Sequence, residues 1–372
     1  MSSVKTIFIL GGYGTTGKCV CQLLLQQKAD VRIIIAGRRE IQAKNYALFL
    51  NSKYSTDIVS YAYCDPSIPS TLAAIKGSNI TIVLSPNSKE IVQIAMACIQ
   101  YSSDFYDVIY SSTKVASLKL IADQIKKSGL LFITDGGYHP GMPAIFSRKS
   151  LEVLPKAVKI LSYSVIKEDF VNYNFSANKW GDFVEELTRY EACKYELGKK
   201  KKVSLLGKQS QKTFDFGRFG KAKVSLMNLE ELNELSIKYP LLNEIAFYVW
   251  GFSSVTNNVV IPLILMIGKW FKKCATKLFE WSLKYSKGPF YSVLRTEASC
   301  DSMNFVIEAS HSNMYMFTGI AIVACILQYL RGEYDYQGLI TQGMLCNPTE
   351  FIRDCQSMGM TIKDCFYRIM KI

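Results

Sequence analysis

The chain has 372 residues, of which 49% are hydrophobic and 20% are charged, and its formal net charge is +13. This composition is typical of a folded globular protein and excludes extended disorder. The positive balance favours anionic partners such as nucleotide phosphates, nucleic acid or an acidic membrane surface. The sequence has no zinc-finger spacing, no RNP-like motif and no long basic helix. We therefore expect no nucleic-acid partner.

The eleven cysteines are scattered, and their spacing predicts no metal site. The sequence opens almost directly on its first expected strand, with no secretory signal before it. We therefore expect reduced thiols and a cytoplasmic protein.

The first expected elements are a strand, a glycine-rich turn and a helix. Lys5–Leu10 is a short apolar run rich in strand-forming residues, and residues 18–27 have helical apolar spacing. The pattern Gly12-x-Gly14-x-x-Gly17 lies between them, which is the context of a dinucleotide-binding loop. We expect Gly12 to allow the tight turn, Gly14 to let a pyrophosphate approach, and Gly17 to let the helix pack closely.

Backbone N–H groups at the start of that helix would then bind the phosphates. The predicted phosphate-binding residues are Gly11, Gly12, Tyr13, Gly14, Thr15, Thr16 and Gly17. The alternative is that the glycines form only a tight turn between a strand and a helix.

The second expected strand, residues 31–36, ends in Gly37-Arg38-Arg39, and the first carboxylate after it is Glu40. An NAD-binding version carries an acidic residue at this end for the ribose 2′-hydroxyl. Two guanidiniums suit a 2′-phosphate instead, because they form several charge-assisted hydrogen bonds with it. The sequence therefore predicts NADP(H) as the cofactor. The alternative is a solvated pair of arginines.

Strands and helices keep alternating up to residue 135. Further strands are expected at 58–63, 80–84, Asp104–Asp107 and 130–134, and helices at 72–75, 90–100 and 115–128. This order predicts an α/β fold with a doubly wound parallel sheet.

Ligands of such sheets bind beyond the carboxyl ends of the strands. Asp65 is expected near the adenine, or else as a turn residue before Pro66. The other residues expected at this edge are Ser85, Pro86, Asn87, Tyr106, Asp107 and residues 136–140, with Ser85, Pro86, Gly136 and Gly137 expected to contact the cofactor.

Three side chains near the expected nicotinamide are candidates for moving a proton. His139 lies in a glycine-rich loop at a strand end, and an imidazole titrates near neutral pH. Tyr138 and Tyr106 are alternative acids, and Asp107 could orient any of them. The alternative is that His139 has no catalytic role and is a loop residue whose conformation is set by Pro140. His311 is expected to be structural.

The second half has a mixed pattern. We expect strands over 156–176, a helix over 182–197, turns and strands over 203–219, and a short helix over 229–237. The lysine run Lys199–Lys202 is expected to be a solvated loop. Together these patterns predict an inserted α+β domain.

Residues 245–294 are unusual because 245–268 contain no charged residue and a lysine- and aromatic-rich stretch follows. Three interpretations stay open. The segment forms a helix pair in the core or at a homodimer interface, it contacts a membrane surface peripherally through residues 245–287, or it spans a bilayer. Polar residues between 253 and 258 and Pro262 argue against spanning.

Three motifs together resemble the saccharopine dehydrogenase-like oxidoreductases: "GGYGTTGK" near the start, "AGRR" after the second strand and "DGGYHPGMPA" at 135–144. The tail segments "YMFTGIAIVACILQYLRG" (315–332) and "GLITQGMLCNPTEFIRDCQSMGM" (338–360) resemble the closing helices of that family. The resemblance implies a Rossmann domain completed by C-terminal segments, with an inserted domain that carries an antiparallel-rich sheet. Some members act on amino acids, and others are lipid-associated or enoyl-reducing.

The expected division is an NADP-binding Rossmann domain at 1–150, an α+β substrate or dimerisation domain at 151–310, and C-terminal helices at 311–372 that return to the Rossmann domain. The favoured function is NADP(H)-dependent hydride transfer to or from a C=N, C=O or C=C bond of a small substrate, amino-acid-derived or lipid-like. The alternative is a non-catalytic NADP(H)-binding scaffold that docks on a membrane surface or a partner protein.

Overall fold

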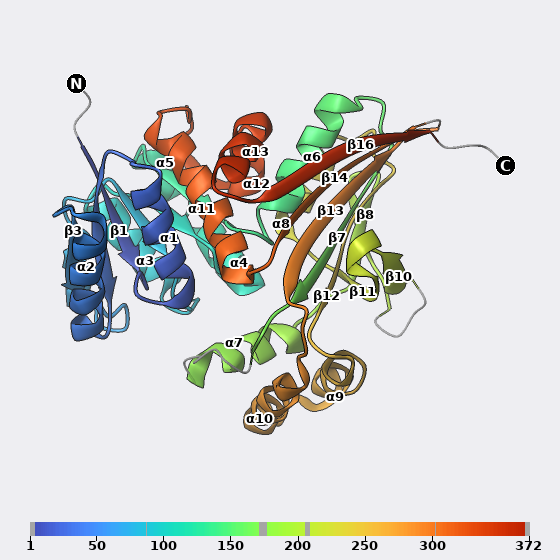
Figure 1. Ribbon diagram of the computed structural model, residues 1–372, viewed down its shortest axis with the longest axis horizontal. Coiled ribbons are helices and arrows are strands. Elements are labelled where there is room, and N and C mark those ends of the chain that lie inside the picture. Colours follow the sequence, from blue (N-terminus) through green and yellow to red (C-terminus); the bar gives the residue numbers. More distant parts are fainter. Residues whose placement is uncertain (1–3, 87, 171–176, 205–208, 302, 369–372) are drawn as a thin grey trace. The chain divides into compact units, whose positions relative to one another are not determined.

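The computed structural model describes residues 4–86, 88–170, 177–204, 209–301 and 303–368. It divides into two compact units. Unit 1 contains Met1–Met142 and Thr318–Gly359, and unit 2 contains Pro143–Phe317 and Met360–Ile372. Each unit is described separately below (Figure 1).

Unit 1 contains a seven-stranded parallel sheet in the order β15-β6-β5-β4-β1-β2-β3. Its strands are β1 (Lys5–Leu10), β2 (Val31–Gly37), β3 (Val59–Tyr63), β4 (Ile80–Val83), β5 (Asp104–Asp107), β6 (Leu131–Thr134) and β15 (Gly338–Thr341). Its helices are α1 (Thr15–Gln26), α2 (Glu40–Tyr54), η1 (Pro69–Ile75), α3 (Ile91–Gln100), α4 (Ser112–Leu120), α5 (Ala122–Lys127), α12 (Gln342–Leu345) and α13 (Pro348–Ser357), and α11 (Met314–Leu330) begins at the boundary.

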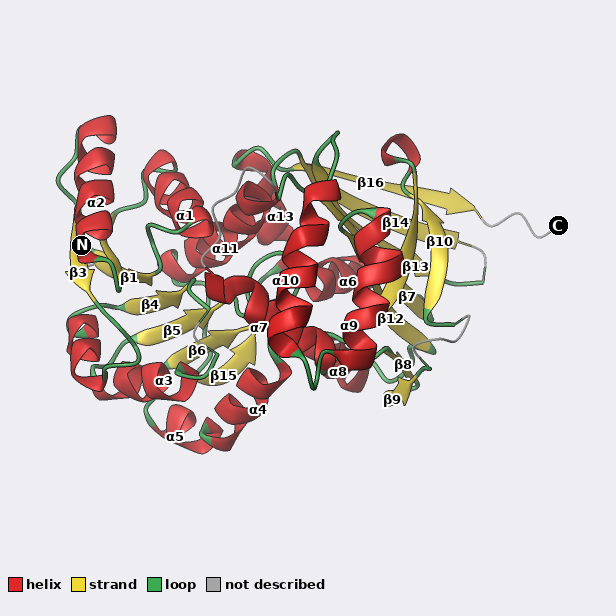
Figure 2. Ribbon diagram, turned by 90° about the horizontal axis from the view of Figure 1, so that it is seen from below, coloured by secondary structure: helices red, strands yellow, loops and turns green. Residues whose placement is uncertain are grey.

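Helices cover both faces of this sheet, with α1 and α11 on one side and α3 and α5 on the other (Figure 2). Gly319 lets α11 lie close to α1, because a Cβ there would stand 2.9 Å from the Cβ of Cys19. Strands buried on both faces are apolar throughout, as β1 and β4 are. The predicted doubly wound α/β fold is confirmed.

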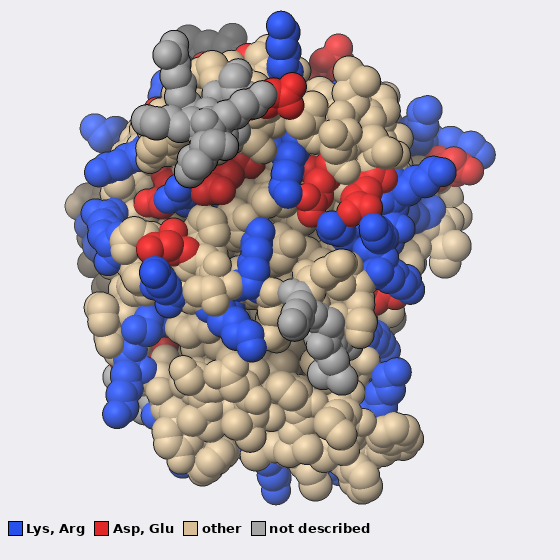
Figure 3. Space-filling view, turned by 90° about the vertical axis from the view of Figure 1, so that its right-hand side faces the viewer, with Lys and Arg blue, Asp and Glu red and all other residues tan. Residues whose placement is uncertain are grey.

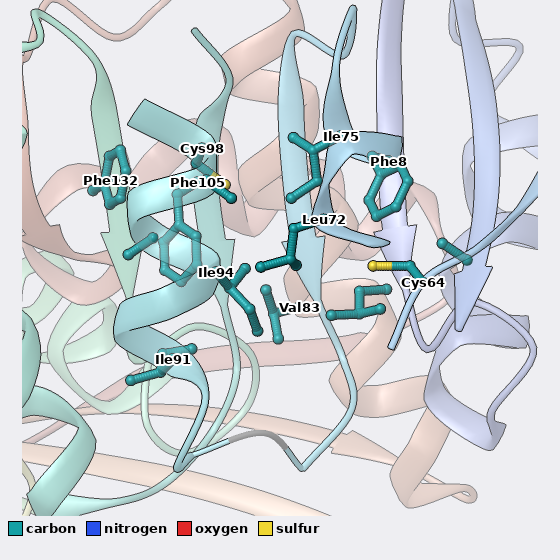
Figure 4. Close-up of a cluster of buried hydrophobic side chains, with 14 of the residues drawn as sticks. Phe8, Cys64, Leu72, Ile75, Val83, Ile91, Ile94, Cys98, Phe105 and Phe132 are labelled. Carbon is teal, nitrogen blue, oxygen red and sulfur yellow. The ribbon is translucent and has the colours of Figure 1, made fainter. Parts of the chain in front are cut away.

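The core between this sheet and α3 is formed by tightly packed aliphatic and aromatic side chains (Figure 4). Phe105 and Phe132 stack with ring centroids 5.0 Å apart. The fully buried Ile94 and Cys98 lie on α3, and Phe8 on β1 stands at the other end of the cluster (Figure 4). This core fixes the strand ends from which the candidate site is built.

Unit 2 contains a mixed sheet in the order β10-β11-β12-β7-β13-β14-β16, with the hairpin β8–β9 attached to β12. Its strands are β7 (Lys159–Lys167), β8 (Cys193–Glu196), β9 (Lys199–Lys202), β10 (Gln211–Asp215), β11 (Lys221–Met227), β12 (Glu244–Gly251), β13 (Tyr291–Ser299), β14 (Met303–His311) and β16 (Thr361–Arg368). Its helices are α7 (Ala177–Thr188), η2 (Gly217–Phe219), α8 (Glu230–Lys238), η3 (Thr256–Val260), α9 (Ile261–Ile267), α10 (Lys272–Ser282) and η4 (Leu283–Tyr285), and α6 (Met142–Val153) begins at the boundary.

Several expectations for the second half were wrong in detail. The expected helix over 182–197 ends at Thr188, and Cys193–Glu196 is strand β8. Lys199–Lys202 is not a loop but strand β9, which pairs with β8. Its lysines form ion pairs with Glu191 and Glu196, which lie on or beside the facing strand. The cross-strand charge pairs explain how four consecutive lysines form a strand.

The apolar stretch beginning at residue 245 is also divided. Its first part is strand β12, which pairs in parallel with β7. Its second part is η3 and α9, which pack with α7 and α10 around Trp180, Val184 and Phe279. In the described part of the chain, no helix has the length and apolar content needed to cross a bilayer. The tail at 311–372 contains, besides helices, strand β15 in the sheet of unit 1 and strand β16 in the sheet of unit 2.

Candidate active site

The glycine loop joins β1 to α1, and its backbone is turned tightly. Gly11 has φ +88°, a left-handed backbone conformation that favours glycine. A Cβ on Gly17 would lie 2.3 Å from the carbonyl oxygen of Gly11, so only glycine lets α1 approach this closely. The N-cap of α1 is Gly14, which has no side chain to cover the first N–H groups of the helix. A helix N-terminus without a side-chain cap can bind an anion through these N–H groups.

The end of β2 carries the two predicted arginines. Arg38 and Arg39 are both exposed, and Arg39 is the N-cap of α2. Tyr13 lies across this strand end, where its hydroxyl accepts a hydrogen bond of 3.0 Å from the backbone N–H of Arg39. A Cβ on Gly37 would stand 2.6 Å from that hydroxyl. The loop residue Tyr13 therefore fixes the backbone of the arginine pair, while the guanidiniums stay accessible.

The next strand ends were expected to complete the cofactor site. Asp65 makes a turn, because its carboxylate accepts hydrogen bonds from the N–H and the hydroxyl of Ser67 at 3.0 and 2.8 Å. That is the turn alternative of the sequence analysis. The backbone N of Ser85 lies 3.0 Å from where a Cβ of Gly11 would stand, so the Ser85-Pro86 end of β4 adjoins the glycine loop. Asn87 lies outside the described residues.

Gln342, at the start of α12, joins the ends of β5 and β6 in a way that the sequence did not predict. The hydroxyl of Tyr106 donates a 2.5 Å hydrogen bond to Gln342 Oε1. The same oxygen accepts from the N–H of Gly137 at 3.0 Å, and Gln342 Nε2 donates to the carbonyl of Gly137 at 3.2 Å. All three residues are buried. Gln342 therefore holds the Gly136-Gly137 loop.

Lys114, on α4, is a second feature that the sequence analysis missed. Its ammonium is completely buried and lies 2.7 Å from a carboxylate oxygen of Asp107 and 2.7 Å from one of Asp135. Burial alone would lower the pKa of Lys114, but the two carboxylates raise it, so the lysine is charged. Thr134 also donates a hydrogen bond to Asp107 at 2.8 Å. The carboxyl ends of β5 and β6 are thus linked through one cation.

The three candidate acids differ in access. Tyr106 and Tyr138 are buried, and burial raises the pKa of Tyr106 well above its usual range. The structure gives Tyr106 a positioning role toward Gln342 and Gly137. His139 is partly exposed, and its ring centroid lies 4.4 Å from that of Tyr138. Burial lowers the pKa of His139 to about 4, so its imidazole is neutral at pH 7.

A signal for one of the missed residues was present in the sequence. Lys114 stands four positions before Leu118, which lies on the buried face of the helix. A lysine on an apolar helix face needs an anionic partner. Asp107 and Asp135, at two neighbouring strand ends, were the available ones. Gln342 gave no such signal, because nothing local connects it with residues 106 and 137.

Residues 7–129 match the family model described as the saccharopine dehydrogenase NADP binding domain. The chain carries this domain. The match covers β1 through α5, including the glycine loop and the arginine pair, and it confirms the resemblance to the saccharopine dehydrogenase-like family.

Among solved structures, the chain is similar to an apo saccharopine dehydrogenase (L-Glu forming) from Saccharomyces cerevisiae, with 14% identity and a TM-score of 0.71. That alignment covers 98% of this chain and 100% of the other, and at this identity it shows the fold alone. A mutant meso-dapdh from Clostridium tetani aligns at 13% identity over 93% of this chain and 95% of that one, with a TM-score of 0.46. A search of curated proteins finds no match.

The domain and the fold are those of NAD(P)-dependent oxidoreductases. The N-terminus of α1, whose N-cap Gly14 makes no side-chain capping hydrogen bond, fits a phosphate group such as those of a dinucleotide.

Proposed function

We propose that the protein is an NADP(H)-dependent oxidoreductase that transfers a hydride to or from a C=N, C=O or C=C bond of a small amino-acid-derived or lipid-like substrate. The observation that carries the proposal is the pairing of the open α1 N-terminus with two exposed arginines at the end of β2. The helix end binds the pyrophosphate, and Arg38 and Arg39 bind the ribose 2′-phosphate. When bound, the dinucleotide supplies or accepts the hydride.

Residues at the ends of β5 and β6 position the part of the site where the nicotinamide and the substrate would meet. Gln342 fixes the Gly136-Gly137 loop, and the Lys114 cluster fixes the two strand ends below it. His139 follows this loop directly and is the one candidate acid or base of the three with an exposed part. Because its imidazole is neutral, it accepts a proton from a substrate hydroxyl or amine in the oxidative direction.

Cofactor choice is tested by fluorescence titration of the full chain with NADPH and NADH. Arg38→Ala/Arg39→Ala should weaken NADPH binding by about tenfold or more, since charge-assisted hydrogen bonds contribute about 1.5–3 kcal/mol each. NADH binding should be unchanged. The matched control is Arg32→Ala/Lys76→Ala, which removes two exposed cations near the amino ends of the strands and should change neither affinity. Equal affinity of the wild type for both dinucleotides would contradict the proposal.

Catalysis is tested by a substrate screen that follows NADPH oxidation and NADP⁺ reduction. His139→Ala should keep NADPH affinity and lose turnover by about a hundredfold or more, since positioned acid–base groups contribute 10²–10⁴-fold. His311→Ala is the matched control, because His311 is structural and bonds to Asn313 in unit 2. Tight NADPH binding with no turnover on amino-acid, carbonyl or enoyl substrates would favour the scaffold alternative.

A further inference from the structure

The helix formed by η3 and α9 exposes a row of apolar side chains, with the polar Ser254 and Asn258 exposed beside it near its start. Its inner face buries Thr256, Val260 and Ile264 against the cluster shared with α7 and α10. Four residues at helical spacing stand on the other side: Val255 (37% exposed), Val259 (60%), Leu263 (38%) and Met266 (70%). Trp270 (75%) follows them in the turn after the helix. A surface helix normally carries polar residues there, and a helix that is apolar all round normally has its outer face covered.

These apolar side chains form a stripe, and its most exposed members stand at the end of the helix. The chain turns at Gly268–Trp270, and Trp270 and Phe271 (58% exposed) project beside Met266. Lysines stand on both sides of the aromatic pair in the sequence, at Lys269, Lys272 and Lys273. Tryptophan with flanking lysines is the residue pattern of a membrane–water interface, where the ring is half-buried and the ammonium reaches the headgroups.

The neighbouring helix α10 adds positive charge to the same surface. Seen from below, α9 and α10 lie side by side in front of the sheet (Figure 2). Residues 253–290 contain six lysines and one acid, Glu280. Trp281 on this helix and Tyr285 in the following turn η4 are also exposed, with ring centroids 5.1 Å apart. In the space-filling view, the described side chains on the lower part of the face are mostly uncharged, with basic side chains at its margin (Figure 3).

We propose that this surface of unit 2 docks the protein on an anionic phospholipid surface. The docking surface consists of the apolar stripe from Val255 to Phe271 and of the lysines of α10. The apolar side chains enter the headgroup–acyl boundary, and the lysines bind lipid phosphates. A second copy of the chain is a poorer occupant, because a two-fold interface would place the same lysines against each other. The docking goes beyond the oxidoreductase function and needs no cofactor.

The test is flotation of the full chain with two kinds of vesicle, phosphatidylcholine alone and phosphatidylcholine with phosphatidylserine. The wild type should float with the mixed vesicles, and far less with the neutral ones or at high salt. Met266→Ser/Trp270→Ser should reduce the partition coefficient by about tenfold or more. Lys273→Gln/Lys277→Gln should reduce it by about 25-fold for mixed vesicles only, since each of the two lysines near such a surface contributes about a factor of five.

Two matched controls separate docking from general effects. Leu241→Ser removes an isolated apolar side chain of the same unit that is 84% exposed, and Lys221→Gln/Lys223→Gln removes two exposed lysines of β11. Both should float like the wild type. No flotation of folded wild type with mixed vesicles at low salt overturns the proposal. So does a dimer in sedimentation that Met266→Ser/Trp270→Ser converts to monomer. NADPH binding, measured in parallel, should be the same in every docking variant, so failure here is distinct from failure of the oxidoreductase proposal.

Discussion

The two parts of the ligand-binding edge of the parallel sheet are built in opposite ways. At the ends of β1 and β2 the groups offered to a ligand are backbone N–H groups and exposed guanidiniums. The side-chain links there are those of the Tyr13 hydroxyl with the N–H of Arg39 and of the Arg39 guanidinium with Gln42. At the ends of β5 and β6 the polar side chains are buried and bonded to each other, through Lys114 on one side and Gln342 on the other.

The difference is whether the polar groups of each part are left to bond with a ligand or are bonded to each other within the chain. The first part is open, so we expect its arginines to change stability little and affinity strongly, because their proposed partner is the ligand. The second part is already satisfied within the chain, so removing one member leaves a buried charge or dipole alone. We therefore expect variants of the two parts to separate binding from stability.

The largest effect is expected when the buried cation is removed. Lys114→Met leaves the carboxylates of Asp107 and Asp135 buried without their shared partner, and breaking a buried ion pair in this way costs about 3–5 kcal/mol. The free energy of unfolding, measured in urea at pH 7, should fall by that amount. Lys119→Met, on the exposed side of α4, should change it by less than about 0.5 kcal/mol. Equal stability of the two variants would contradict the buried triad.

A change at the glycine loop should affect both quantities. Gly17→Ala places a Cβ 2.3 Å from the Gly11 carbonyl oxygen, so α1 must move away from the loop. Such overpacking costs about 1–3 kcal/mol, and NADPH affinity should fall because the first N–H groups of α1 are displaced. In Gly181→Ala the added Cβ meets nothing within 4 Å, and Gly181 lies in helix α7, so this control should raise stability by about 0.5–1 kcal/mol. Unchanged NADPH affinity in Gly17→Ala would argue that the loop holds no phosphate.

The parallel sheet was predictable because its signals are local. Each strand is a short apolar run, and each is followed by a turn and a helical pattern, as in Lys5–Leu10 and the residues after it. The mixed sheet was not, because its strands pair over long separations. The run Lys199–Lys202 becomes a strand only through Glu191 and Glu196, and the apolar stretch after residue 244 is divided by the pairing of β12 with β7. Tertiary contacts decide such segments, not local propensity.

The candidate site was likewise predictable only where its signals lie close together along the chain. The glycine loop and the arginine pair follow from spacing along ten to thirty residues and were found in the sequence. Gln342 is 236 residues from Tyr106, and no pattern along the chain connects them. The tyrosines were plausible acids by position, but only the structure shows that Tyr106 and Tyr138 are buried.

The smallest effect is expected at His139, the partly exposed member of the closed part of the edge. Burial lowers the pKa of its imidazole to about 4 from the usual 6.5, so between these values the unfolded chain binds a proton that the folded chain does not. Stability contributed by neutral His139 is therefore present above pH 6.5 and is lost as the pH falls toward 4. His139→Gln cannot bind that proton. The full pKa shift corresponds to about 3 kcal/mol between pH 7 and 4, and the partial exposure of the side chain reduces this to about 1 kcal/mol. The loss of unfolding free energy between pH 7 and 4, measured in urea at each pH, should therefore be smaller in His139→Gln than in the wild type by about 1 kcal/mol. Buried carboxyls such as Asp104 titrate in both proteins and cancel in the difference. Parallel curves for the two proteins would mean that the imidazole is solvated in solution, and His139 would then belong with the open part of the edge.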